Sequence, residues 1–210
     1  MIEAVLFDWS NTLVRFEWDE ELVLAGHRAA LGRDDAEFTT RWREAVRERR
    51  PYADILRELG VDDTDAFIDA EHEVWQPATT VLASAQALLE SLRTRGVKTG
   101  VVATAWPEPA RVLLADAERL GLAEYLDVLL FADGGEKPFQ QALDELGVDA
   151  SAAMYVGDSL ERDVQAAADL GMTTVQALWF VADDTSPAAE PDFMAFTSMD
   201  VLNAVLRLAR

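Results

Sequence analysis

The chain has 210 residues, half of them hydrophobic and 27% charged, a composition typical of a globular protein with a sizeable core. Its net charge of −21 argues against binding to nucleic acid or to anionic membranes. It has no cysteine, which excludes disulfides and a thiol nucleophile. No signal-peptide pattern precedes the first apolar segment and no apolar run could span a bilayer, so we expect a cytoplasmic protein.

Short apolar segments predict the strands of a sheet. Those with the length and composition of buried parallel strands are Ala4–Phe7, Lys98–Ala103, Val128–Phe131, Ala153–Val156 and Thr173–Ala177. From the second segment onward they alternate with helical patterns. This alternation predicts an α/β fold with a doubly wound, Rossmann-like parallel sheet and helices on both of its faces.

Helical periodicity and glycine stop signals predict the helices. One helix is expected around Leu88–Leu92 and ends before Gly96. The others are expected at Pro107–Leu120, Phe139–Leu146, Glu161–Leu170 and Met199–Leu208. The small and acidic residues of Ala182–Pro191 predict a loop.

The segment between the first two strands breaks this alternation. Residues 15–77 show helical periodicity and no convincing strand, and they exceed the dozen or so residues that a crossover needs. Pro77–Thr80 marks the return to the sheet. We therefore expect a small α-helical cap domain at 15–77, inserted into an α/β core domain made of 1–14 and 78–210.

Two patterns inside this insert bear on its packing and charge. Leu22, Ala25 and Ala29 indicate an apolar stripe on its first helix. A cluster of arginines could meet an anionic substrate, but interleaved glutamates favour a solvated helix face with local ion pairs. The arginines of this cluster are Arg41, Arg43, Arg47, Arg49 and Arg50.

Polar side chains follow successive strands at the points where the strands end. Asp8 follows the first strand, Thr104 the second, and Lys137 lies just after the third. Asp158 follows the fourth strand, and Asp163 lies in the first turn of the next helix. The carboxyl ends of parallel strands meet at one edge of a sheet, where ligands bind. We therefore expect these side chains to share one pocket.

Three carboxylates in one pocket repel each other unless a cation joins them, and hard oxygen donors suit Mg²⁺. Asp8 could then attack phosphorus and form an aspartyl-phosphate that water hydrolyses. Lys137 and the Thr104 hydroxyl would neutralise the equatorial oxygens. Taken alone, Asp158 could instead be a helix N-cap and Asp163 a partner of the helix dipole.

The order and spacing of these residues resemble the haloacid dehalogenase superfamily of hydrolases over almost the whole chain. The first motif of that family, Asp-x-Asp-x-Thr after a hydrophobic strand, matches Asp8 and Thr12, with Ser10 in place of the second acid. The other motifs are a strand ending in Thr or Ser, a Lys-Pro pair and Gly-Asp-x-x-x-x-Asp. They match Thr104, Lys137-Pro138 and Gly157–Asp163.

This resemblance implies a Mg²⁺-dependent hydrolase of the small helical-cap type. It makes Asp8 the nucleophile, with Ser10, Thr104 and Lys137 as the other catalytic positions. The metal ligands that it implies are Asp8, the backbone carbonyl of Ser10, Asp158 and Asp163. We expect a phosphatase that acts on a small phosphorylated or anionic metabolite.

Ser10 restricts the chemistry that can be expected. In the phosphatase branches that the chain resembles, the acid at this position protonates the leaving oxygen and later activates water. A serine hydroxyl cannot do this near neutral pH, and such acid–base help is worth about 10²–10⁴-fold. The enzyme could act on good leaving groups such as acyl or aryl phosphates, or use Glu17 or Asp19 of the insert as the acid.

Other functions stay open. Dehalogenases of the family attack carbon without a metal and lack the paired acids, so the Asp158/Asp163 pair argues against that reaction. Phosphonate-cleaving members use a cap lysine, and this insert contains none. From another class, the chain could be a regulatory protein that binds metal and phosphate with weak or no turnover. The sequence leaves the oligomeric state open.

Overall fold

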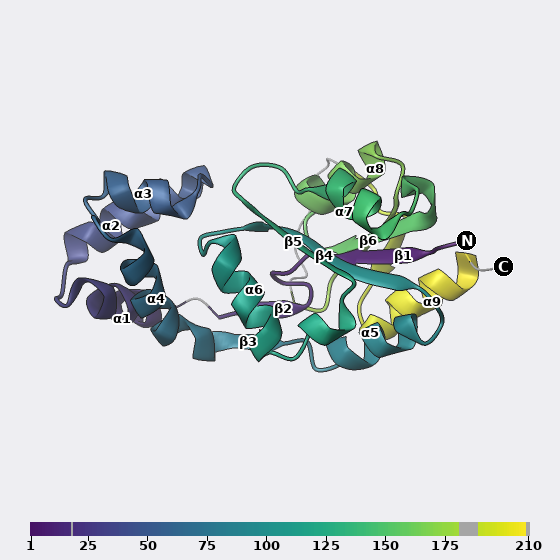
Figure 1. Cartoon of the computed structure of the whole chain (residues 1–210), viewed down its shortest axis with the longest axis horizontal. Helices are drawn as coiled ribbons and strands as arrows, with labels where there is room; N and C mark the ends of the chain where they lie inside the picture. Colours follow the sequence, from purple (N-terminus) through teal and green to yellow (C-terminus); the bar gives the residue numbers. More distant parts are fainter. Residues whose placement is uncertain (18, 181–188, 209–210) are drawn as a thin grey trace.

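The computed structural model describes residues 1–17, 19–180 and 189–208, and it contains a six-stranded parallel sheet with a separate group of helices beside it (Figure 1). The strand order is β5-β4-β1-β6-β7-β8. The strands are β1 (Ala4–Phe7), β4 (Lys98–Ala105), β5 (Val128–Asp133), β6 (Ala153–Gly157), β7 (Thr173–Ala177) and β8 (Phe193–Ala195). Because β1 lies between β4 and β6, the strand order reverses at β1, which is the doubly wound arrangement expected.

The five predicted strands are present, and β8 is an additional strand at the edge of the sheet. It pairs in parallel with β7, with Phe193 opposite Val175. A three-residue strand is too short to show a periodic pattern, which is why the sequence did not predict it. Most of the loop expected at Ala182–Pro191 lies outside the described residues, and 189–191 have no regular structure.

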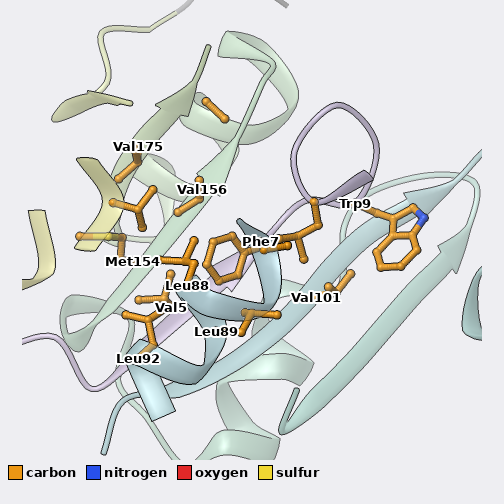
Figure 2. Close-up of a cluster of buried hydrophobic side chains, with 14 of the residues drawn as sticks. Val5, Phe7, Trp9, Leu88, Leu89, Leu92, Val101, Met154, Val156 and Val175 are labelled. Atoms are coloured by element: carbon orange, nitrogen blue, oxygen red, sulfur yellow. The ribbon is translucent and has the colours of Figure 1, made fainter. Parts of the chain in front are cut away.

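Helices cover both faces of the sheet (Figure 1). Successive residues of a strand point to opposite faces, so Val5 and Phe7 pack on one face and Ala4 and Leu6 on the other. The first face is covered by α5 (Ala85–Arg93), α6 (Ala110–Arg119) and α9 (Ser198–Leu208). Figure 2 shows Phe7 among Leu88, Leu89 and Met154 on this face. The second face is covered by α7 (Phe139–Leu146) and α8 (Ala166–Asp169).

The helix expected at Glu161–Leu170 begins as a π-helical turn over Leu160–Gln165 and continues as α8. The Ser159 amide donates to the Asp163 Oδ2 atom at 2.9 Å, so the wider turn carries this carboxylate back over the end of β6. A Cβ atom on Gly157 would lie 2.3 Å from the Asp163 carboxyl carbon. A glycine is therefore needed at the end of β6 for the carboxylate to take this position.

The helical part consists of α1 (Glu20–Leu31), α2 (Ala36–Ala45), α3 (Tyr52–Glu58) and α4 (Thr64–Trp75). Three of these helices start at an aspartate whose side chain accepts a backbone N–H, as helix N-caps do. These aspartates are Asp19, Asp35 and Asp63. The group has its own apolar core, which includes Trp42, Ile55, Leu56, Phe67 and Trp75. Short 3₁₀ turns lie at Val46–Glu48, Gln76–Ala78, Ala123–Tyr125 and Ala150–Ala152.

The apolar stripe predicted for α1 is only partly correct, because Leu22 packs against the helical core and Ala25 is half-buried, but neither lies at the centre of the buried face. The helix buries Val23, Gly26 and His27, whereas Ala29 is exposed. The cause is a close approach between helices, since a Cβ atom on Gly26 would lie 2.3 Å from the Trp75 Nε1 atom. The face of α1 that packs on α4 is therefore set by a glycine and a large indole, which an apolar pattern does not reveal.

The two chain segments that join the helices to the sheet pair with each other. β2 (Val14–Phe16) and β3 (Thr79–Val81) form an antiparallel ribbon, with Val14 opposite Val81 and Phe16 opposite Thr79. Residues 15–77 were expected to contain no strand, and β2 corrects this expectation at their start. The strand was missed because three residues carry too little pattern to be predicted. None of the helices in the described part of the chain is long and apolar enough to cross a membrane.

Candidate active site

The residues predicted to share a pocket meet at the carboxyl edge of the sheet. The amide of Asp8 donates to the Val156 carbonyl at 2.8 Å, which fixes the residue beyond the end of β1. The Lys137 ammonium donates to the Asp8 Oδ1 atom at 2.6 Å and also contacts the Asp163 Oδ1 atom. These three side chains are nearly buried, with exposed fractions of 11% for Asp8, 7% for Lys137 and 1% for Asp163.

Tyr155 on β6 holds Lys137 in place, and the sequence did not point to this role. Its hydroxyl accepts from the Lys137 ammonium at 2.8 Å and donates to the Val102 carbonyl at 2.7 Å. The ammonium also lies 5.2 Å from the centre of the tyrosine ring. A signal was present, because Tyr155 is the one residue of Ala153–Gly157 whose side chain ends in a polar group other than sulfur.

Three carboxylates form the negative centre of the site. Asp8, Asp158 and Asp163 each offer an oxygen, and these atoms lie within 4.8 Å of one another. Burial raises the pKa of Asp8 to about 7, although the charge of Lys137 opposes this. Burial, and then the charge of Asp163, raises the pKa of Asp158 to about 6. One ammonium therefore does not neutralise the cluster, and an all-oxygen donor set with residual negative charge fits a hard divalent cation.

Lys137 keeps its proton in this setting. Burial alone would lower the pKa of its ammonium, but the charges of Asp8 and Asp163 outweigh burial and raise it. Each oxygen of Asp163 already has a partner, since Oδ1 contacts Lys137 and Oδ2 accepts from the Ser159 amide. A carboxylate oxygen has two lone pairs, so both atoms can still accept another partner.

The other predicted positions line the same cavity. Thr104, within β4, donates its hydroxyl to the Gly135 carbonyl at 3.2 Å. Ser10 is exposed. Beside it, Asn11 takes the left-handed backbone conformation (φ 57°) that asparagine tolerates well, and its amide donates to the Asp158 Oδ2 atom at 3.3 Å. This loop thus places polar groups beside Asp8.

The cavity has a volume of about 220 Å³. Five predicted site residues line it, namely Asp8, Ser10, Thr104, Lys137 and Asp158. The remaining lining residues are Asn11, Phe16, Arg49, Trp106 and Arg162, none of which the sequence identified as part of the site. Glu17 and Asp19, considered above as substitute acids, do not line it.

The helical part contributes Arg49 to this cavity. Ion pairs of Arg43 with Glu20 and of Arg50 with Glu58 agree with the expected solvated face. Arg49 departs from that expectation, because its guanidinium lies 4.5 Å from the centre of the Trp106 ring, at the mouth of the site. Its backbone is left-handed (φ 52°) at the end of the Val46–Glu48 turn, and a sequence pattern does not reveal such a conformation.

Comparison with known proteins identifies the family. Residues 2–171 match the haloacid dehalogenase-like hydrolases. The chain is 30% identical to a ribulose-1,5-bisphosphate 5-phosphatase from Halopiger xanaduensis, over 83% of this chain and 84% of that protein. It is 28% identical to a glyceraldehyde 3-phosphate phosphatase from Methanopyrus kandleri over the full length of both. The crystal structure of a HAD phosphatase from Thermococcus onnurineus is similar with a TM-score of 0.73 at 25% identity, covering 97% of this chain and 98% of that one. The chain therefore belongs to the haloacid dehalogenase-like hydrolases, with an α/β core and an inserted helical cap.

Proposed function

We propose that this hydrolase is a Mg²⁺-dependent phosphatase that transfers the phosphoryl group of a small phosphorylated metabolite to Asp8. The observation that carries the proposal is the position of the Lys137 ammonium, which bonds to Asp8 at 2.6 Å and contacts Asp163 at the edge of the sheet. The phosphatase names of the two relatives, which align over most or all of the chain, support the same reaction.

In this proposal, an oxygen of Asp8 attacks phosphorus while the bond from phosphorus to the leaving oxygen breaks. Water then attacks the aspartyl-phosphate, which releases inorganic phosphate and restores the carboxylate. Lys137 keeps a positive charge beside the attacking group, and Thr104 lines the cavity where its hydroxyl can donate to a phosphoryl oxygen. Neither residue needs to lose or gain a proton during the reaction.

The metal site that we propose uses Asp8, Asp158, Asp163 and the backbone carbonyl of Ser10. When bound, Mg²⁺ would offset the negative charge of the carboxylates and of the phosphoryl group. Burial raises the pKa of Asp8 and of Asp158, so added positive charge beside them would favour their ionised forms. Binding of a cation therefore favours the ionised nucleophile.

Because position 10 is a serine, we propose that the reaction rate depends strongly on the leaving group. Its hydroxyl lines the cavity but cannot deliver a proton near neutral pH, and no acid of the described cap lines the cavity in its place. We therefore propose that acyl and aryl phosphates, whose leaving groups need no proton, react faster than alkyl phosphates. We also propose that the cap comprises residues 15–77 and sets which substrates enter.

The test is turnover of aryl, acyl, sugar and nucleotide phosphates, with and without Mg²⁺, by the wild type and by Asp8→Asn. We expect Mg²⁺-dependent release of phosphate by the wild type and loss of at least about 10³-fold in Asp8→Asn, since no nucleophile remains. Asp149→Asn is the matched control, because Asp149 is exposed and its side chain caps no helix. A second measurement is thermal unfolding, in which Mg²⁺ should raise the Tm of the wild type more than that of Asp158→Asn.

The alternatives make different predictions. Equal turnover by the wild type and Asp8→Asn would overturn the proposed nucleophile. A Tm shift with Mg²⁺ but no turnover of any phosphate would favour a regulatory protein that binds metal and phosphate. Release of halide from a 2-haloacid without metal would favour a dehalogenase instead.

A further inference from the structure

Two arginines from different parts of the fold line the cavity that contains Asp8. Arg49 comes from the cap, between α2 and α3, and Arg162 from the π-helical turn after β6. Both residues are exposed, so an ion that enters the cavity can reach them. With Lys137 they make three cations beside the two acids that line this cavity, in a chain whose net charge is −21.

Arg49 is held by contacts between the cap and the core. The segment between α2 and α3 extends from the cap toward the core (Figure 1). The Trp106 indole N–H donates to the Val46 carbonyl at 2.6 Å, and the same ring lies 4.5 Å from the Arg49 guanidinium carbon. The backbone oxygen of Arg49 would lie 3.2 Å from a Cβ atom on Gly134, so the two backbones are close together. The guanidinium is thereby positioned before any ligand arrives.

Neither arginine has a carboxylate partner. Their neighbours in the cap do, as Arg43 pairs with Glu20 and Arg50 with Glu58, whereas Arg49 and Arg162 form no ion pair with the acids that the structure describes. Partial burial and then the charge of Arg162 lower the pKa of Arg49, whereas the charges of Asp158 and Asp8 oppose this shift. Asp8 and Asp158 line the same cavity but form no ion pair with either guanidinium, so an anionic group that reaches both arginines would still gain charge-assisted hydrogen bonds and reduce their mutual repulsion.

We propose that Arg49 and Arg162 bind a second anionic group of the substrate, a carboxylate or a second phosphate, while the first phosphoryl group faces Asp8. This inference rests on the proposed phosphatase function and narrows its substrate class to small phosphate esters that carry two anionic groups. Arginine suits this task because its planar fork of N–H donors matches an oxyanion.

The test measures competition against turnover of 4-nitrophenyl phosphate, a chromogenic substrate with one anionic group. The inhibition constants of 2-phosphoglycolate and 2-hydroxyethyl phosphate are compared, because the first carries a carboxylate where the second carries a neutral alcohol. The third ligand is ethane-1,2-diol bisphosphate. If its inhibition constant is lower than that of 2-phosphoglycolate, the second anionic group is a phosphate, and if it is higher, that group is a carboxylate. Of the two ligands with two anionic groups, we expect the wild type to bind the better one at least about tenfold more tightly than 2-hydroxyethyl phosphate, which has one.

Arg49→Gln and Arg162→Gln should each reduce this preference about tenfold or more, since each removes a charge-assisted contact. Arg47→Gln is the matched control, because Arg47 lies two residues away but lines a different cavity, on which Asp8 does not border. It should keep the wild-type preference.

Three contrary outcomes can be told apart. Turnover of 4-nitrophenyl phosphate with equal inhibition constants for the three ligands would overturn the second anion site and leave the phosphatase function intact. A preference that survives both arginine substitutions would overturn the assignment of these residues. No turnover of 4-nitrophenyl phosphate would contradict the phosphatase function on which the inference rests.

Discussion

At the scale of single residues, position 10 holds a hydroxyl where the proposed reaction would gain from an acid. Ser10 lies at the exposed rim of the cavity, two residues beyond Asp8, so an aspartate there has room for its side chain. The first half of the reaction then depends on how well the departing group carries negative charge. This makes the leaving group, rather than the attack by Asp8, the point at which substrates differ.

Ser10→Asp should therefore raise kcat on an alkyl phosphate such as a sugar phosphate, by up to about 10²-fold, because it supplies a proton to the leaving oxygen. The gain should be smaller for an aryl phosphate, which needs little protonation. The measurement is kcat with both substrates in Mg²⁺. Ser10→Asn is the control of equal shape without an acid, and equal rates for the two variants would contradict the prediction.

The sequence predicted the residues whose positions follow from strand ends. Asp8, Thr104, Lys137, Asp158 and Asp163 lie at the carboxyl edge because the parallel sheet brings those ends together. The roles proposed for them stay predictions. Arg49 and Arg162 could not be predicted in the same way, since their positions depend on a left-handed backbone and on a π-helical turn.

At the scale of elements, a charged cluster joins the cap to the core. His72 on α4 contacts Glu108 at 2.5 Å and Asp116 on α6 at 3.3 Å, and the three side chains are largely buried. Burial alone would lower the pKa of His72, but the two carboxylates outweigh burial and raise it to about 9. Arg119 adds a further contact to Asp116 at 2.8 Å.

The sign of the resulting pH dependence follows from the raised pKa. The folded protein binds the His72 proton more tightly than the unfolded chain, whose histidine titrates near 6.5. The stabilisation is fully present below about pH 6.5 and is lost as the pH rises through about 9. Over this window it falls by at most about 1.4 kcal/mol per pH unit.

We expect His72→Gln to lower the free energy of unfolding by about 1–3 kcal/mol at pH 6, with a smaller difference at pH 9.5. Urea unfolding at several pH values measures this difference. Arg111→Gln is the control at the same interface, because the Arg111–Asp69 pair is about half exposed and should contribute at most about 1 kcal/mol at either pH. Parallel pH curves for the wild type and His72→Gln would contradict the role of this cluster.

The long elements could be predicted from sequence and the short ones could not. Five strands and most helices of the core have enough residues for a clear pattern. The three-residue strands β2, β3 and β8 do not, and their existence depends on pairing with another strand, which for β2 and β3 lies more than 60 residues away in the chain. The packing of α1 against α4 also escaped prediction, because a glycine rather than an apolar residue faces Trp75.

At the scale of the whole molecule, the charge balance is unusual, with 39 acidic and 18 basic residues. Many acids have arginine partners, but the excess of acids leaves net repulsion across the folded surface. Unfolding moves these charges apart and relieves part of that repulsion. The folded state of this chain is therefore less stable than its apolar core alone would make it.

Added salt should stabilise the protein. Raising NaCl from 0.01 M to 1 M shortens the Debye length from about 30 Å to about 3 Å, which screens repulsion between distant acids more than attraction within close pairs. We expect Tm to rise by several degrees, about 2–4 °C for each kcal/mol gained. KCl should give the same dependence of Tm on salt concentration as NaCl. Sucrose at equal osmolality should not reproduce the steep rise in Tm that salt causes at low concentration. A Tm that falls with salt would show that surface ion pairs dominate.

The ribbon of β2 and β3 has a mechanical consequence. Its strands are the only described connections between cap and core along the chain, and they are paired with each other over Val14–Phe16 and Thr79–Val81. Two separate linkers would let the cap twist, slide and swing, whereas a paired ribbon resists shear along its strands and bends most easily across its plane. The cap should then rock about one axis. That single motion would change the distance between Arg49 on the cap and Asp8, which lies six residues before the ribbon. Opening of the cap would then also release the substrate from Arg49.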